Sequence, residues 1–129
     1  MNGDFLLDTN ILIALFANET AVVDRLKQTE PVFVSSVALG EMYYGAHKSS
    51  RVKENIARLD EFAGSSVILG CDAAVARRYG EVKEKLRQKG QPIPENDIWI
   101  AAIALHYDLT LVTRDSHFQE VESLKVVAW

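Results

Sequence analysis

The sequence predicts an α/β domain with a mainly parallel sheet of about five strands. Short apolar stretches alternate with longer segments in which apolar residues recur at helical spacing, as in chains whose helices connect parallel strands. In addition, 129 residues with 48% hydrophobic and 25% charged side chains are enough for one core and too few for two. We therefore expect a single domain over residues 1–129.

The expected strands are short, apolar and bordered by polar or turn-forming residues. They cover residues 5–7, 32–35, 67–69, 109–113 and 125–128. Because helical segments separate most of them, we expect neighbouring strands to run parallel.

The expected helices are recognised by apolar residues at helical spacing. The first two centre on residues 11–16 and 22–26, and the others cover 37–48, 51–63, 73–89 and 95–107. The N-cap candidates are Thr9 or Asn10 for the first helix, Ser35 or Ser36 for the third and Asp72 for the fifth, which Gly90 ends.

Four acids lie at positions where an acid is unusual, close to apolar strands or to the apolar faces of helices. Asp8 and Asp115 come just after expected strands, and Glu41 and Asp97 lie on or beside the apolar faces of expected helices. Each has an ordinary alternative, such as a helix cap, a turn residue or a surface glutamate. In a parallel sheet, however, all four converge at one edge, where ligands bind in such folds.

Clustered carboxylates repel one another unless a cation joins them. An all-oxygen donor set suits Mg²⁺, with Mn²⁺ as a second choice. Such an ion can orient a water molecule and offset charge on a phosphodiester. We expect Thr9 and Thr113 to hydrogen-bond a carboxylate or a metal-bound water. The histidines are dispersed and are expected at surface or helix-end positions.

Four segments resemble the acidic motifs of the PIN domain family, and most closely those of VapC-type toxins. They read "LLDTNILI", "SSVALGEMYYGA", "PIPENDIWIAAIAL" and "LTLVTRDSHF", in the order of the family. The resemblance spans the whole chain and implies a three-layer α/β/α PIN-like domain with a Mg²⁺-dependent endoribonuclease activity.

The resemblance also implies roles for single residues and for partners. Asp8 and Asp97 would be the most direct Mg²⁺ ligands, while Glu41 and Asp115 hold metal or water. The expected partners are an RNA substrate, a cognate VapB-type antitoxin and a second copy of the chain. DNA would be bound only through the antitoxin. The RNA target and the cut sequence lie outside these motifs.

Basic residues offer further contacts, although the net charge is −4. Arg114, next to Asp115, is expected to contact substrate or antitoxin. Basic clusters lie over residues 48–58 and 77–89, and their alternative is a solvated helix surface paired with glutamates. Trp99 is assigned to the core or to an interface, and Tyr44 to the interior.

Other functions share the fold class. A haloacid dehalogenase-type phosphatase needs a second aspartate where Asn10 stands, and a phospho-receiver domain needs paired acids after the first strand. A catalytically silent PIN-like module that binds RNA or protein stays open as the main alternative.

The chain is expected to be soluble and cytoplasmic. No stretch approaches the roughly 20 apolar residues of a membrane span, and Cys71 has no second cysteine to pair with. We expect Cys71 to be a small core residue.

Overall fold

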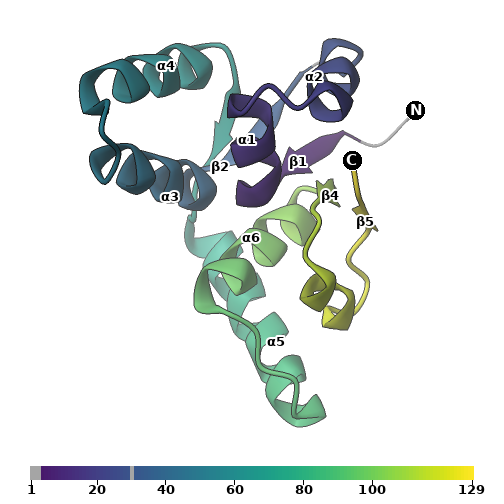
Figure 1. Cartoon of the computed structure of the whole chain (residues 1–129). Coiled ribbons are helices and arrows are strands. Elements are labelled where there is room, and N and C mark those ends of the chain that lie inside the picture. Colours follow the sequence, from purple (N-terminus) through teal and green to yellow (C-terminus); the bar gives the residue numbers. More distant parts are fainter. Residues whose placement is uncertain (1–3, 30) are drawn as a thin grey trace.

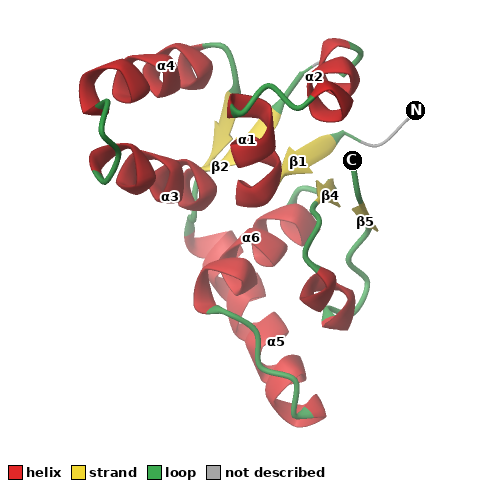
Figure 2. Cartoon of the chain, in the orientation of Figure 1, coloured by secondary structure: helices red, strands yellow, loops and turns green. Residues whose placement is uncertain are grey.

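A computed structural model describes residues 4–29 and 31–129. Five strands form one sheet in the order β3-β2-β1-β4-β5, and all the paired strands are parallel (Figure 2). The strands are β1 (Phe5–Leu7), β2 (Phe33–Ser35), β3 (Val67–Leu69), β4 (Thr110–Val112) and β5 (Val126–Val127). The predicted five-stranded parallel sheet is confirmed, with most strands slightly shorter than expected.

In the part of the chain that the structure describes, six α-helices connect these strands. They are α1 (Thr9–Phe16), α2 (Thr20–Lys27), α3 (Ser36–His47), α4 (Val52–Gly64), α5 (Ala73–Lys89) and α6 (Glu95–His106). Parallel crossovers are right-handed, so α1–α4 cover one face of the sheet and α5 and α6 the other. Figure 1 shows α3 beside α4 and α5 beside α6, and these pairs pack on one another. The predicted three-layer α/β/α architecture is confirmed.

Short polar side chains and one glycine set the helix ends. The Ser35 hydroxyl accepts from Ala38 N, and the Asp72 carboxylate accepts from Val75 N. Gly90, in the left-handed conformation at φ +68°, ends α5. The Asp8 carboxylate caps α1 by accepting from Thr9 N, so the helix-cap alternative for Asp8 is confirmed and the cap assignment to Thr9 or Asn10 is wrong.

Buried side chains of β1, β4 and α6 contribute to the core, together with buried residues of α1 and α5. Residues Ile100–Ala104 are all fully buried, so α6 is covered on nearly every side. The aspartate at the start of this helix therefore stands at the top of a buried segment, as its sequence pattern predicts.

Some predicted core positions are wrong. Cys71 is exposed, because it lies in the connection that follows edge strand β3. Tyr44 is 66% exposed, and half-buried Tyr43 instead donates to Asp60 Oδ1 at 2.5 Å. In the described residues, we find no helix that is long and apolar enough to cross a membrane.

Candidate metal centre

The centre of the sheet brings two aspartates together. β1 and β4 are neighbours, with Leu7 opposite Val112, although most of the chain lies between them. Asp8 follows β1 and donates its backbone N–H to Val112 O at 3.0 Å, and Asp115 lies just beyond β4. Strand order reverses at this point, which is where ligands bind in open parallel sheets.

Asp8 is buried and held on both carboxylate oxygens. Only 4% of the Asp8 residue is exposed to solvent. Oδ1 accepts from Thr9 N at 2.8 Å, and Oδ2 accepts from the Thr113 hydroxyl at 2.7 Å. The predicted contact of Thr113 with a carboxylate is therefore present. These bonds fix the direction in which Asp8 presents its remaining lone pairs.

Glu41 joins the group from α3 through Thr9. The Thr9 hydroxyl donates to Glu41 Oε1 at 2.6 Å, so the predicted contact of Thr9 with a carboxylate is also present. Glu41 is exposed, and so is Tyr44 on the same side of α3. Glu41 was expected on or beside the apolar face of this helix, and its exposure agrees with the alternative of a glutamate at the edge of that face.

Asp97 and Asp115 meet at one imidazole ring. His117 Nε2 lies 2.6 Å from Asp97 Oδ2, and His117 Nδ1 lies 2.9 Å from Asp115 Oδ1. The short 3₁₀ helix η1 (Ser116–Glu120) carries this histidine, and Asp115 caps it by accepting from His117 N. The sequence prediction of a surface or helix-end role for His117 is wrong.

The carboxylates affect one another electrostatically. Burial raises the pKa of Asp8 above its usual value, and the charges of Asp97 and Glu41 raise it further, against the lowering effect of its two hydrogen bonds. Burial also raises the pKa of Asp97, and the hydrogen bond from His117 opposes this rise. Asp115 and Glu41 add to the repulsion at Asp97.

This donor set fits a hard divalent cation. Across the described part of the chain, no lysine or arginine forms an ion pair with the four acids Asp8, Glu41, Asp97 and Asp115. Ligand atoms of Asp97, Asp115 and His117 all lie within 4.8 Å of one another. Carboxylate oxygens that no lysine or arginine neutralises are ligands that Mg²⁺ and Mn²⁺ prefer.

Asn10 is a second residue whose place at the site the sequence did not indicate. Its Nδ2 donates to Thr113 Oγ1 and its Oδ1 accepts from Arg114 N, both at 3.3 Å. Its position close to Asp8 was one signal, since both residues lie on the first turn after β1. For His117 the only signal was its place two residues after Asp115.

Arg114 lies beside the centre, but its guanidinium is directed elsewhere. It donates to both carboxylate oxygens of Glu19, at 2.9 and 3.2 Å, and to Trp129 O at 3.0 Å. These bonds hold the C-terminal residue near the start of α2. The predicted contact of Arg114 with substrate or antitoxin stays a prediction.

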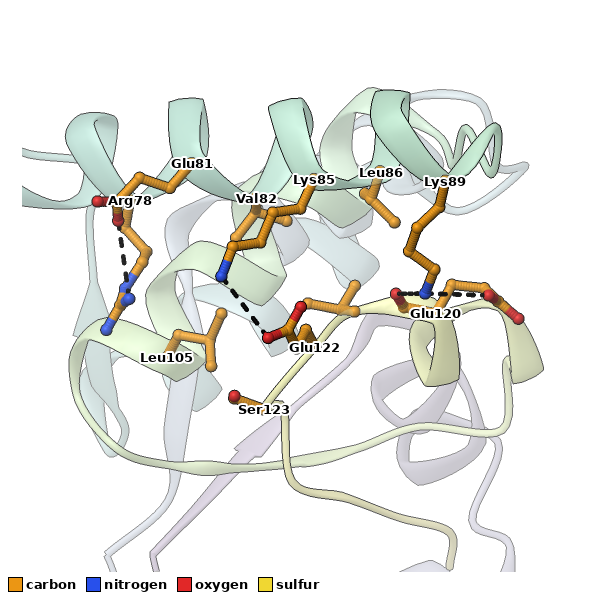
Figure 3. A pocket seen from close by; sticks show the side chains of 11 residues that line it. Arg78, Glu81, Val82, Lys85, Leu86, Lys89, Leu105, Glu120, Glu122 and Ser123 are labelled. Atoms are coloured by element: carbon orange, nitrogen blue, oxygen red, sulfur yellow. Dashed lines mark hydrogen bonds and ion pairs between the residues drawn. The ribbon is translucent and has the colours of Figure 1, made fainter.

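The basic residues of α5 are largely paired with acids. A cavity of about 340 Å³ lies beside α5, where Lys85 is 3.8 Å from Glu122 and Lys89 is 3.3 Å from Glu120. Figure 3 shows these side chains along its wall. Other pairs are Arg78–Glu81, Lys83–Glu95 and Arg87–Glu84, and Arg51–Glu54 occurs on α4. For these residues the alternative of a solvated, paired helix surface is confirmed.

Trp99 is half-buried and packs within the α5–α6 pair. Its ring stacks on Tyr79 with 4.0 Å between centroids. This contact favours the core assignment of Trp99 over the interface.

The PIN domain family profile matches residues 5–124. The chain belongs to the PIN domain family. Ribonuclease VapC2 of Haemophilus influenzae is 35% identical over 128 residues, which are 97% of each chain. The tRNA(fMet)-specific endonuclease VapC of Shigella flexneri is 34% identical, again over 97% of each chain. Within the PIN family, the chain is thus of the VapC type, and the predicted nuclease class is confirmed.

A solved structure shows the same fold. VapBC2 from Rickettsia felis, bound to a DNA fragment from its promoter, matches with a TM-score of 0.89 and 31% identity. The match covers 97% of this chain and 98% of that one. The PIN domain thus spans nearly the whole sequence.

Proposed function

We propose that this PIN domain is a Mg²⁺-dependent endoribonuclease toxin that hydrolyses RNA phosphodiester bonds. The observation that carries the proposal is that Asp8, Glu41, Asp97 and Asp115 lie near one another and, among the described residues, form no ion pair with a lysine or arginine, His117 being the one imidazole in contact with two of them. We assign all four as metal and water ligands. Asp8 and Asp97, the two whose pKa values burial raises, are assigned as the most direct Mg²⁺ ligands.

The chain's own residues prepare this site before an ion binds. Thr113 and the Thr9 backbone hold Asp8, and the Thr9 hydroxyl holds Glu41, so these carboxylates need little reorganisation. His117 keeps Asp97 and Asp115 together. When bound, a divalent cation supplies orientation of a water and charge neutralisation at the phosphate.

The proposed partners follow from the relatives. The solved structure that matches is a toxin–antitoxin complex, so we propose a VapB-type antitoxin as the inhibitor of this chain. DNA would then be contacted through the antitoxin. A homodimer is proposed as the working assembly, and Arg114 as a contact for substrate or antitoxin once its bonds to Glu19 exchange.

The second candidate is a silent PIN-like module that binds RNA or protein without cleaving it. Such a module would have no need to keep Asp8 and Asp97 buried close to further acids, since burial and neighbouring negative charge raise the pKa of both carboxyls and so oppose their ionisation in the absence of a cation. Retention of the whole set therefore favours the enzyme.

The deciding experiment is cleavage of total cellular RNA by protein freed of any bound antitoxin. Wild type, Asp97→Asn and the control Asp24→Asn, an exposed aspartate on α2, are each assayed with Mg²⁺, Mn²⁺ and EDTA. We expect metal-dependent cleavage by wild type and Asp24→Asn, and none by folded Asp97→Asn. Cleavage by Asp97→Asn at the wild-type rate would refute the site. Binding without cleavage would support the silent module, and the fragment ends would identify the RNA target.

A further inference from the structure

An open pocket begins at the metal centre and runs between three helices. It has a volume of about 250 Å³ and lies where α1, α3 and α4 face one another (Figure 1). Thr9 and Glu41, which belong to the metal centre, form part of its wall. We call it the Phe16 pocket. Its occupant would therefore lie beside the proposed metal centre.

The wall of the Phe16 pocket is mainly apolar. Ile13, Phe16, Met42 and Leu59 line it. Ile13 is 57% exposed, although it lies in the first helix beside the most buried part of the sheet. An apolar, open surface with a few polar groups is typical of a binding site.

A cation lies in the wall of the same pocket. Arg58 places its guanidinium 4.9 Å from the centroid of the Phe16 ring and donates to Phe16 O at 3.2 Å. Within the described chain it forms no ion pair with an acid, in contrast to the paired cations of α5. Asn55 adds an amide, whose Nδ2 donates to Ser49 Oγ. Cationic and amide groups beside an aromatic ring suit a ligand that is both planar and anionic.

We propose that the Phe16 pocket binds an unpaired nucleobase of the RNA, adjacent to the scissile phosphate. This inference rests on the proposed ribonuclease function. Unpaired bases stack on aromatic rings and on arginine planes, and hydrogen-bond through their edges. The backbone phosphates beside such a base need a cation, and Arg58 supplies it. A purely apolar ligand would make no use of the Arg58 charge. It would also not explain why the pocket adjoins the acidic site.

The test compares matched pairs of variants on one RNA. Ile13→Ser and Arg58→Gln alter the pocket, whereas Ile68→Ser and Arg77→Gln make the same changes at exposed positions on β3 and α5. The substrate is a short single-stranded RNA that the wild type cleaves, selected from a random-sequence pool. A second version carries an abasic nucleotide on either side of the cut.

For wild type, we expect the abasic nucleotide on one side to lower kcat/KM about tenfold or more, since stacking of one base contributes on this scale. On intact RNA, the kcat/KM of Ile13→Ser and of Arg58→Gln should fall by a similar factor. On abasic RNA, these variants should have nearly the same kcat/KM as wild type, because the missing base and the altered pocket remove the same interaction. The two control variants should behave as wild type. If the losses in kcat/KM caused by a pocket variant and by the abasic nucleotide multiply, the two act independently and the proposal is wrong.

Two other outcomes are distinguishable from this one. If the pocket variants cleave normally but lose affinity for an antitoxin peptide, the pocket belongs to the protein partner and the RNA proposal is wrong. If wild type cleaves no RNA, the proposed function fails, and the same comparison is made by RNA binding affinity. Non-additive losses of RNA affinity from the pocket variants and the abasic nucleotide would then support the base pocket. Equal RNA affinities of the pocket variants and wild type would refute it.

Discussion

At the scale of the residue, the site is a chain of short polar contacts around clustered charges. Thr9 joins Glu41 to the Asp8 segment, Thr113 bonds Asp8, and His117 joins Asp97 to Asp115. Each acid gains orientation, while the pKa values of Asp8 and Asp97 record the unfavourable burial of charge. Function and stability therefore oppose each other at these residues.

The pH dependence of stability in metal-free protein follows from the raised pKa of Asp8. Folded protein keeps this proton to higher pH than the unfolded chain does, so the free energy of unfolding falls as pH rises between the two pKa values. The penalty is absent below the unfolded pKa and complete above the folded pKa. We expect the Tm of Asp8→Asn, relative to wild type, to be higher at neutral than at mildly acidic pH.

This difference is measured by thermal unfolding in EDTA across that pH range. Asp8→Asn also loses the bond donated by Thr113, because an amide N–H would replace the accepting oxygen. The lost hydrogen bond shifts the Tm difference between variant and wild type by the same amount at every pH. The change of this Tm difference with pH is therefore the informative quantity. A Tm difference that does not vary with pH would contradict the prediction.

His117→Ala should weaken metal binding. Without the imidazole, Asp97 and Asp115 lose their shared partner and separate. Removing a residue that orients ligands typically lowers metal affinity or activity by about 10–100-fold. Mn²⁺ titration followed by electron paramagnetic resonance measures the affinity directly, with exposed His106→Ala as the control. Unchanged affinity in His117→Ala would show that this histidine is not a positioning residue.

At the scale of the element, strand ends and helix starts deliver the acids. Asp8 lies between β1 and α1, Asp97 is in the first turn of α6, and Asp115 precedes η1. The first N–H groups of a helix have no partner within the helix, and carboxylates suit them, so local structure and the proposed metal site favour the same residues. This is why their helix-cap alternatives were plausible from sequence.

Two glycines of α5 should respond to alanine in opposite directions. Gly90 has φ +68°, where a Cβ is unfavourable, so Gly90→Ala should destabilise by about 1 kcal/mol. Gly80 lies within the helix, and no neighbouring atom lies within 4 Å of the position that an alanine Cβ would take. Gly80→Ala should therefore stabilise by about 0.5–1 kcal/mol. Urea unfolding measures both, and a gain at Gly90 would contradict the left-handed helix end.

At the scale of the whole molecule, the metal centre connects segments from both ends of the chain. The proposed ligands come from the β1–α1 junction, α3, α6 and the segment after β4. If an ion binds where they meet, it should stabilise the fold as a unit.

Addition of Mg²⁺ or Mn²⁺ to metal-free protein should raise Tm. At a hundredfold excess over Kd the stabilisation is about 2.7 kcal/mol. Differential scanning calorimetry of wild type and Asp97→Asn with each ion makes the comparison, with Ca²⁺ as a test of selectivity. An equal rise in the variant would place the bound ion elsewhere.

From the sequence alone, the strands, the helices and the parallel sheet were predictable, and four acids could be nominated as the ligands that we propose. These depend on local patterns that can be recognised in the sequence itself, namely apolar spacing, capping residues and acids just past strands. The same patterns misplaced Cys71, Tyr44 and His117, because burial depends on which faces meet in space. Tertiary structure alone decided that one imidazole joins Asp97 to Asp115, that Glu19 engages Arg114, and that an apolar pocket adjoins Glu41. Each of these contacts joins residues from different elements, and their distances are set by packing rather than by sequence spacing.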